Sequence, residues 1–240
     1  MSVYNCSYMI KVDAAATGAL NGQVALVTGA GAGAGRKIAE TLAFAGASIA
    51  ANDITPMNVE AVAASIRSRG ATAMAYVEDL TRGMPIRYLI DRIVSDLGRL
   101  DILVNAAKVQ HPAGILEMDE WDWQRTMDVN LGGPFLLMQT SARKMQTQGG
   151  GVIVNLVVDG VNGTSNAGMP AYYAGKSGLL ALSRAAAQEF LPYNIRVHAL
   201  CCDAFSLPDD SDEVCDRPGR YDTIAKVITL LCISATRMPR

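Results

Sequence analysis

The sequence predicts a doubly wound α/β fold, in which helices cover both faces of a parallel β-sheet. Short apolar runs recur along the chain, and the stretches between them are long enough for a helix. A parallel strand is reached only by a crossover, and crossovers of this kind place helices on both faces of the sheet. The predicted strands are QVALVTG (23–29), ASIAAND (47–53), ATAMAYVED (71–79), LDILVNAA (100–107), GVIVNL (151–156) and IRVHAL (195–200).

Length and composition predict one domain. Of the 240 residues, 50% are hydrophobic and 18% are charged, which is enough apolar material for one large core. We expect this domain to cover residues 1–240, with an N-terminal extension at 1–20 and a short substrate-side surface loop at 204–220. Residues 221–234 read as a last helix, and no further strand pattern follows them. The sheet is therefore expected to lack its last strand.

Charge and apolar patterning exclude several classes of partner. The formal net charge is −2, and the Lys and Arg residues are scattered instead of clustered, so we expect no nucleic-acid partner. No stretch reaches eighteen apolar residues and the N-terminus shows no secretory pattern, so we expect a cytoplasmic protein without a membrane span. The five cysteines have no C-x-x-C spacing and only two histidines to join them, which argues against a metal site or a disulfide framework.

A glycine-rich turn, TGAGAGAG at residues 28–35, separates the first long strand from the next helix. Its glycines allow a sharp turn and a close approach to a pyrophosphate at the helix N-terminus. The general G-x-G-x-x-G spacing fails, because the third glycine would fall on Ala34, whereas T-G-x-x-x-G-x-G fits. Alone, such a turn is equally explained by close packing of a helix against a strand.

Asp53 ends the second strand, where a carboxylate can bind both hydroxyls of the adenosine ribose and repel a 2′-phosphate. This favours NAD over NADP. Arg36 is the counterargument, because its guanidinium would pair with a 2′-phosphate if it turned toward it. We give more weight to Asp53, since ligands of open α/β sheets bind at the carboxyl ends of strands.

Tyr172 and Lys176 lie four residues apart at the start of a predicted helix, AYYAGKSGLLALSRAAAQEF (171–190), and so share one face. A lysine one turn from a tyrosine lowers the pKa of the phenol, which prepares its oxygen for proton transfer near neutral pH. The pair alone is also what an ordinary surface tyrosine and lysine would give.

The motifs together resemble the short-chain dehydrogenase/reductase family, most of all its 3-oxoacyl-acyl-carrier-protein reductase and small-alcohol dehydrogenase branch. The resemblance runs from about Leu20 to about Leu200 and rests on order and spacing. It is carried by TGAGAGAG, Asp53, Asp79-Leu80, LVNAA (103–107), Asn130 in MDVNLGG, IVNL (153–156) and YYAGK (172–176).

The resemblance implies a Rossmann fold and an NAD-dependent oxidoreductase that transfers hydride between a nicotinamide and a hydroxyl or carbonyl group. Tyr172 would be the acid/base, Lys176 would bind the nicotinamide ribose and the tyrosine, and Asn130 would hold a proton-relay water. In relatives, the helices corresponding to 123–145 and 171–190 pack against a second copy, which implies a homodimer or homotetramer.

The same resemblance implies a set of cofactor contacts. Asp79 and Leu80 would border the adenine, and Asn105 would brace the sheet beside the cofactor. The implied cofactor-binding residues are Gly29, Ala32, Gly33, Ala34, Gly35, Asp53, Ile54, Asp79, Leu80, Asn105, Ala106, Ala107, Tyr172 and Lys176.

The chain departs from the family at its catalytic serine, because Val157 and Val158 stand where two serines are usual. Counting back from Tyr172 instead reaches Asp159, which we expect to face away because strand side chains alternate and Val158 takes the serine's direction. Thr164 and Ser165 are further candidates for the missing hydroxyl. Loss of one such donor weakens catalysis without abolishing it.

Further departures leave a second interpretation open. Lys108 replaces a family glycine and would crowd the site or contact a phosphate, and Cys202-Asp203 replaces the usual Pro-Gly. His111 is a possible substitute polar group, although a lone loop histidine more often faces solvent. The alternative function is a catalytically impaired homologue that acts as a sensor, subunit or scaffold. Because Tyr172 and Lys176 are retained, we favour the active oxidoreductase over the impaired homologue.

Overall fold

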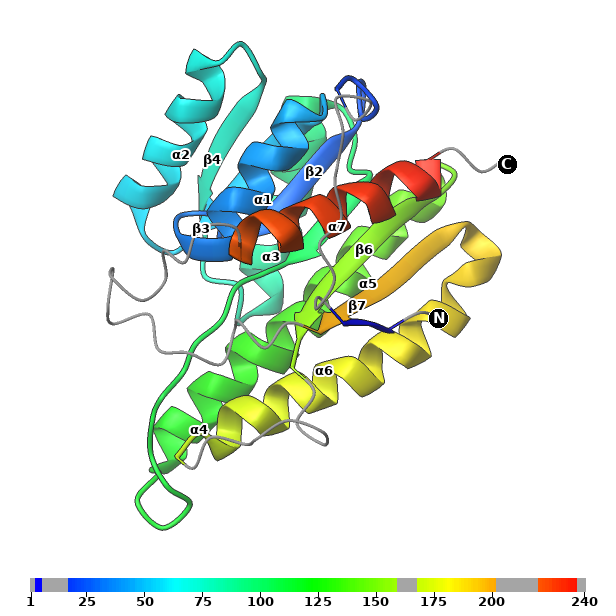
Figure 1. Ribbon diagram of the computed structural model, residues 1–240. Coiled ribbons are helices and arrows are strands. Elements are labelled where there is room, and N and C mark those ends of the chain that lie inside the picture. The colour runs from blue at the N-terminus through cyan, green and yellow to red at the C-terminus, as the bar shows by residue number, and fades with distance from the viewer. Residues whose placement is uncertain (1–2, 6–16, 159–167, 202–219, 237–240) are drawn as a thin grey trace.

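The computed structural model describes residues 3–5, 17–158, 168–201 and 220–236 (Figure 1). The described strands form one parallel sheet in the order β1-β7-β6-β5-β2-β3-β4, which confirms the predicted doubly wound architecture. The strands are β1 (Val3–Asn5), β2 (Val24–Thr28), β3 (Ser48–Asp53), β4 (Ala73–Val77), β5 (Ile102–Asn105), β6 (Gly151–Val157) and β7 (Ile195–Cys201).

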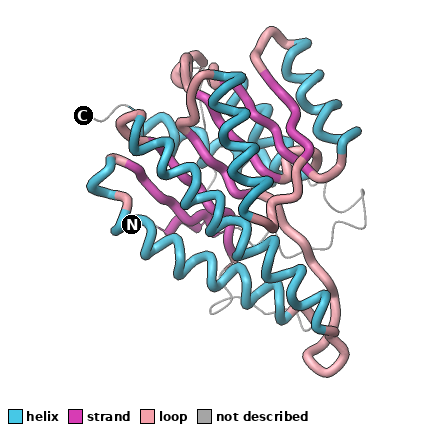
Figure 2. Tube along the Cα trace, turned by 180° about the vertical axis from the view of Figure 1, so that it is seen from behind, coloured by secondary structure: helices cyan, strands magenta, loops and turns pink. Residues whose placement is uncertain are grey.

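Helices cover both faces of the sheet, as Figure 2 shows from behind. One core lies under α1, α2 and α7, and the other lies under α3, α5 and α6. The helical segments are α1 (Gly33–Phe44), α2 (Pro56–Ser68), α3 (Gly83–Leu97), α4 (Glu120–Met127), the π-helical turn η2 (Asp128–Gly132), α5 (Gly133–Thr147), α6 (Pro170–Glu189), the 3-10 turn η3 (Leu191–Tyr193) and α7 (Arg220–Thr236).

The central strands are buried on both faces, which explains why their sequences read as continuous apolar runs. In β2, Val27 belongs to the core under α1 and α7, whereas Leu26 belongs to the core on the opposite face. Val104 and Leu103 divide in the same way in β5. The runs therefore supply two cores at once through the alternation of strand side chains.

The edge of the sheet beside β7 differs from the sequence expectation. No strand follows β7 within the described residues, but β1 pairs with it in parallel, with Val3 opposite Ala199 and Asn5 opposite Cys201. A segment from the start of the chain thus covers an edge whose N–H and C=O groups would otherwise be unpaired. The N-terminal extension contributes to the sheet, which its sequence did not indicate.

Two cysteines of the described part, Cys201 and Cys232, are buried. Burial raises the pKa of the Cys232 thiol to about 12, which keeps it protonated and unreactive. Among the residues that the structure describes, no group of three or more histidine, cysteine or acidic side chains is placed to hold a metal ion. Within the same ranges, no helix has both the length and the hydropathy needed to cross a membrane.

Asp101 joins three strands at the amino end of the sheet. Its carboxylate accepts a hydrogen bond from the Val24 N–H at 2.9 Å and bonds from the Arg99 guanidinium at 2.7–2.9 Å. Its backbone N–H donates to Val24, and its C=O accepts from Val152. The side chain is buried while Arg99 stays partly exposed, so the carboxylate satisfies a buried backbone donor and is itself neutralised.

Replacement of Asp101 tests this junction. Asp101→Ala leaves the buried Val24 N–H without an acceptor and is expected to lower the free energy of unfolding by about 2 kcal/mol. Asp101→Asn keeps an acceptor oxygen and should cost less. Urea denaturation of both variants measures the difference, and equal losses in the two would show that only the charge matters.

Candidate active site

The glycine loop between β2 and α1 depends on close backbone approaches. Gly29 and Gly33 have φ of 65° and 51°, in the left-handed region that favours glycine. A Cβ on Gly35 would collide with the carbonyl oxygen of Gly29, so a side chain there would force the loop open. The loop folds back on itself and directs the first turn of α1 toward the carboxyl ends of the strands.

Asp53 lies at the end of β3 and supports this loop. One carboxylate oxygen accepts a hydrogen bond from the Gly31 N–H at 3.0 Å, and the other accepts from the Thr55 N–H at 2.9 Å. Arg36 does not turn toward Asp53 or the strand ends, because its guanidinium is paired with Glu40 one turn along α1 at 3.0 Å. Asp53 is thus held by backbone donors, and Arg36 is held by its own helix.

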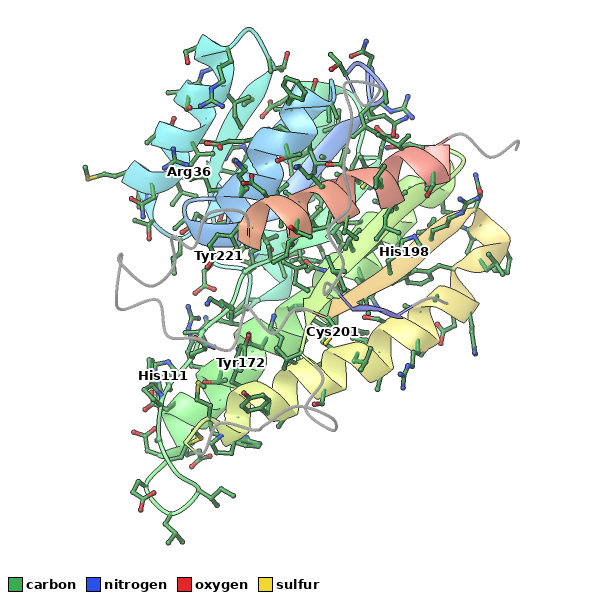
Figure 3. All side chains as sticks on the ribbon, viewed as in Figure 1. Arg36, His111, Tyr172, His198, Cys201 and Tyr221 are labelled. Carbon is green, nitrogen blue, oxygen red and sulfur yellow. The ribbon has the colours of Figure 1, made fainter. Side chains whose placement is uncertain are left out.

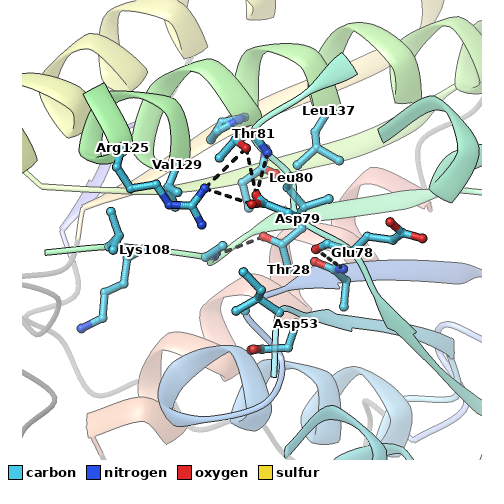
Figure 4. A pocket seen from close by; sticks show the side chains of 17 residues that line it. Thr28, Asp53, Glu78, Asp79, Leu80, Thr81, Lys108, Arg125, Val129 and Leu137 are labelled. Carbon is cyan, nitrogen blue, oxygen red and sulfur yellow. Dashed lines mark hydrogen bonds and ion pairs between the residues drawn. The ribbon is translucent and has the colours of Figure 1, made fainter. Parts of the chain in front are cut away.

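Two cavities adjoin the loop. The larger, about 160 Å³, lies across the carboxyl ends of β2, β3 and β5 (Figure 4). The smaller, about 130 Å³, lies over the glycine loop. Gly29, Asp53, Ala107 and Lys108 line both cavities, so the two are parts of one elongated site. A long ligand lying across the strand ends would contact both.

Asp79 closes the far end of the larger cavity through a polar cluster. Its carboxylate accepts hydrogen bonds from Arg125 at 3.0 Å and from the Thr81 N–H and hydroxyl at 3.1 and 3.0 Å. Partial burial alone would raise the pKa of Asp79, but the hydrogen bonds from Arg125 and Thr81 outweigh it and lower the pKa. The carboxylate is therefore ionised and fixed in place (Figure 4).

A row of polar side chains crosses the sheet at the level of the site. Thr28, Asn105 and Asn155 are register partners on β2, β5 and β6. The Thr28 hydroxyl oxygen accepts bonds from the N–H groups of Ala106 and Ala107, both at 3.1 Å. Asn105 donates to Asn155 at 2.7 Å. The row orders the backbone that follows β5, where the cavity begins.

Asn130 lies inside the π-helical turn η2, an irregularity often found at functional sites. Its amide donates to the carbonyls of Val109 and Thr126 at 2.8 and 2.9 Å. Within the described part of the chain, its buried Oδ1 has no hydrogen-bond partner. Asn130 also packs against α6 at Gly175, where a Cβ would approach that of Asn130 to 3.1 Å. An unused acceptor thus lies beside α6.

Tyr172 and Lys176 are both buried on the first turns of α6, and Gly175 lies between them in the sequence. Figure 3 shows Tyr172 pointing from α6 toward the strand ends. The Lys176 Nζ has no hydrogen-bond partner among the described residues. Burial, and then the charge of Lys108, lowers the pKa of Lys176 to about 7.

The lowered pKa of Lys176 makes the stability of the folded chain depend on pH. The unfolded chain holds the proton up to about pH 10.5, whereas the folded chain releases it near pH 7. The energetic cost of the buried charge is therefore fully present below pH 7 and falls as the pH rises from 7 toward 10.5. Such a cost is typical of a side chain retained for chemistry rather than for folding.

Val158 faces the same core as Tyr172, and Val157 faces the opposite core. Val158, which follows the last residue of β6, therefore presents an apolar side chain on the side of Tyr172, as the alternation along the strand predicted. The alternative donors Asp159, Thr164 and Ser165 lie outside the described residues, as do Cys202-Asp203 and the predicted loop up to residue 219.

Most of the residues that the sequence predicted to bind a cofactor line one or both of the two cavities. Tyr172 and Lys176 are not among the lining residues of either cavity. The ones that line at least one cavity are Gly29, Ala32, Gly33, Ala34, Gly35, Asp53, Ile54, Asp79, Leu80, Asn105, Ala106 and Ala107. The structure thus gathers glycine loop, strand ends and the segment after β5 around one space.

The sequence interpretation missed several residues of this space. Arg125 and Tyr221 come from helices, and no motif marks either of them. His111, considered as a substitute polar group, pairs with Asp122 at 3.1 Å and stands edge-on to Trp121. It therefore ties its loop to α4 (Figure 3) instead of lining either cavity.

Comparison with known proteins agrees with this geometry. A 3-oxoacyl-acyl-carrier-protein reductase of Thermotoga maritima is 33% identical over 227 residues, which cover 88% of this chain and 91% of that protein. The structure of NAD⁺-bound xylitol dehydrogenase matches with 36% identity and a TM-score of 0.73, covering 76% of this chain and 70% of that one. A metagenomic short-chain oxidoreductase in complex with NADP matches with 30% identity and a TM-score of 0.80, covering 92% and 93%.

The family model described as short chain dehydrogenase matches residues 23–213. This range includes the glycine loop, η2 and the first turns of α6, so it spans the whole site described above. The chain belongs to the short-chain dehydrogenase family, and it is an oxidoreductase that acts on hydroxyl or carbonyl groups with a nicotinamide cofactor.

Proposed function

We propose that the protein is an NAD-dependent reductase or dehydrogenase of a small carbonyl or alcohol substrate, with residues 1–240 forming one domain. The observation that carries the proposal is the buried pair Tyr172 and Lys176 beside Asn130, at the same end of the sheet as the two cavities. A buried lysine without a hydrogen-bond partner in the described part destabilises the fold. Side chains that are kept at such a cost are often functional.

The residues present fit a dinucleotide. Cβ atoms at Gly29 or Gly35 would meet backbone atoms, so these glycines keep the loop tight beside the cavity that it lines, at the N-terminus of α1. In the described residues, the buried Oδ1 of Asn105 and the Nζ of Lys176 lack partners, and a ligand with ribose hydroxyls supplies donors and acceptors for both. The elongated space formed by the two cavities suits a two-part ligand.

Asp53 and Arg36 support NAD over NADP. The Asp53 carboxylate lines both cavities, where it would accept bonds from ribose hydroxyls and repel a 2′-phosphate. The Arg36 guanidinium, which would favour NADP, is occupied by Glu40. Solved relatives include one bound to NAD⁺ and one bound to NADP, so the choice is argued from these two side chains.

The proposed mechanism assigns the protein's side chains to proton transfer. A bound nicotinamide supplies or accepts the hydride. The Tyr172 Oη gives a proton to a substrate oxygen in reduction and removes it in oxidation. Protonated Lys176 stabilises the phenolate by its charge. Asn130 Oδ1, which has no hydrogen-bond partner among the described residues, accepts from a water that resupplies the proton.

Val158 places a limit on this chemistry. The side chain that faces Tyr172's core at the end of β6 cannot donate a hydrogen bond to the reacting oxygen. Removal of one such donor costs on the order of a hundred- to a thousandfold in rate in well-studied enzymes. We therefore propose a slow enzyme rather than an inactive one, in which Tyr172 alone orients the substrate oxygen.

We further propose a cytoplasmic homodimer or homotetramer in which α4, α5 and α6 contact a second copy. Large apolar side chains of α4 and α5 are exposed in the single chain, with Trp121 68%, Trp123 41% and Phe135 43% exposed. Exposed aromatic residues gathered on neighbouring helices are typical of subunit contacts. A mass of 25.4 kDa by light scattering at micromolar concentration would contradict an oligomer.

Tyr172→Phe tests the catalytic assignment. Oxidation of NADH with a panel of 3-oxoacyl thioesters and simple ketones is expected to fall by about a hundred- to ten-thousandfold, because only the proton donor is lost. Tyr173→Phe is the matched control, since Tyr173 stacks edge-on against Tyr172 but is not assigned a proton. Equal effects of both variants, or a wild type that binds NADH without turnover, would contradict the mechanism.

Asp53→Asn tests the choice of cofactor. The amide oxygen can still accept from one of the two backbone donors, but the charge that repels a 2′-phosphate is gone. The ratio of kcat/KM for NADH to that for NADPH should be high in the wild type and fall at least tenfold in the variant. Glu78→Gln removes a second carboxylate of the same cavity and should leave the ratio unchanged.

Val158→Ser tests the missing donor. A hydroxyl at this position faces the core that holds Tyr172 and is expected to raise kcat at least tenfold. Val157→Ser, one residue earlier and facing the opposite core, should give no gain. Both variants bury a hydroxyl, so a gain shared by the two would speak against a specific donor.

A further inference from the structure

Lys108 stands where the two cavities meet. It follows the Ala106-Ala107 segment that Thr28 holds in place, and it lines the cavity over the glycine loop as well as the cavity across the strand ends. Figure 4 shows its side chain extending from this segment along the edge of the larger cavity. An ammonium at this junction is close to the middle of any ligand that spans both cavities.

Two basic side chains of α1 beside the loop are paired with carboxylates. Arg36 is bound to Glu40, and Lys37 is bound to Asp222 of α7 at 2.7 Å. The first turn of α1 carries no acidic residue, so its N-terminal N–H groups are not neutralised by the helix itself. The cavity over the loop thus combines helix N–H groups with the charge of Lys108.

Lys176 lies outside the lining of both cavities, but the charge of Lys108 acts on it. Its Nζ is buried and has no hydrogen-bond partner within the described ranges, and its pKa is lowered first by burial and then by the charge of Lys108. Repulsion between the two ammonium groups raises the free energy of the folded chain. An anion beside Lys108 would relieve that repulsion.

Tyr221 closes the cavity over the loop from the other side. The ion pair between Lys37 and Asp222 fastens the start of α7 to α1. It places the Tyr221 hydroxyl 3.8 Å from where a Cβ on Gly33 would lie. The cavity is therefore bounded by the glycine loop, by Lys108, by a hydroxyl and by Asp53, whose two carboxylate oxygens are bound by the Gly31 and Thr55 N–H groups. The loop, the ammonium and the hydroxyl suit phosphate oxygens.

We propose that Lys108 binds the pyrophosphate of the dinucleotide, with the Tyr221 hydroxyl enclosing it from α7. The inference rests on the proposed dinucleotide site. It adds to that site a charged side chain, Lys108, at a position where the family pattern has a glycine. Binding of the pyrophosphate next to Lys108 also shields Lys176 from a like charge, so the bound cofactor favours the ammonium form of Lys176.

The test measures binding of ADP-ribose and of adenosine, which has no phosphate, by calorimetry. Lys108→Met is expected to weaken the binding of ADP-ribose about tenfold at 50 mM salt, with a smaller difference at high salt. The affinity for adenosine should be unchanged. Lys108→Arg should retain affinity. Arg36→Met removes the same charge from the neighbouring helix turn and should change the ADP-ribose affinity by less than threefold.

Three outcomes would overturn the inference. Equal ADP-ribose affinity of wild type and Lys108→Met, with adenosine bound by both, would remove Lys108 from the phosphate site. Unchanged ADP-ribose binding together with a higher KM for a carboxylate-bearing carbonyl substrate would assign Lys108 to the substrate instead. A wild type that binds neither NADH nor ADP-ribose would overturn the proposed function as well, which separates that failure from the first two.

Discussion

The polar row at the carboxyl ends of the central strands is the interaction on which the site depends. Thr28, Asn105 and Asn155 share one register level, and Asn155 continues the row by donating to Ser183 of α6 at 2.8 Å. Buried polar groups must find partners, so this chain of bonds permits only one register between the sheet and α6. It thereby holds the glycine loop, the segment after β5 and the Tyr172 helix in a single arrangement.

The charged side chains of the site lower the stability of the fold but are suited to catalysis and ligand binding. Lys176 is buried with its pKa lowered to about 7, and Lys108 adds a like charge nearby. At the other end, Asp79 is held ionised by Arg125 and Thr81. A folded chain tolerates such groups only when the rest of the core is well packed, and here each face of the sheet is covered by a continuous apolar cluster.

The structure also changes the meaning of the departures from the family pattern. Val158 is a true apolar substitution on the Tyr172 side, because alternation along β6 leaves no other orientation for it. Lys108 does not fill either cavity but borders both. Among the described residues no strand follows β7, and β1 from the start of the chain pairs with its edge.

The sequence alone determined the order of strands and helices, the glycine loop and the one-turn spacing of Tyr172 and Lys176. These features are local: apolar runs, glycine positions and a helical repeat are written in neighbouring residues. Only the tertiary structure decided that Arg125 meets Asp79, that Tyr221 of α7 lies over Gly33, and that β1 pairs with β7. Such contacts join residues far apart in the chain, and they depend on packing that no local pattern encodes.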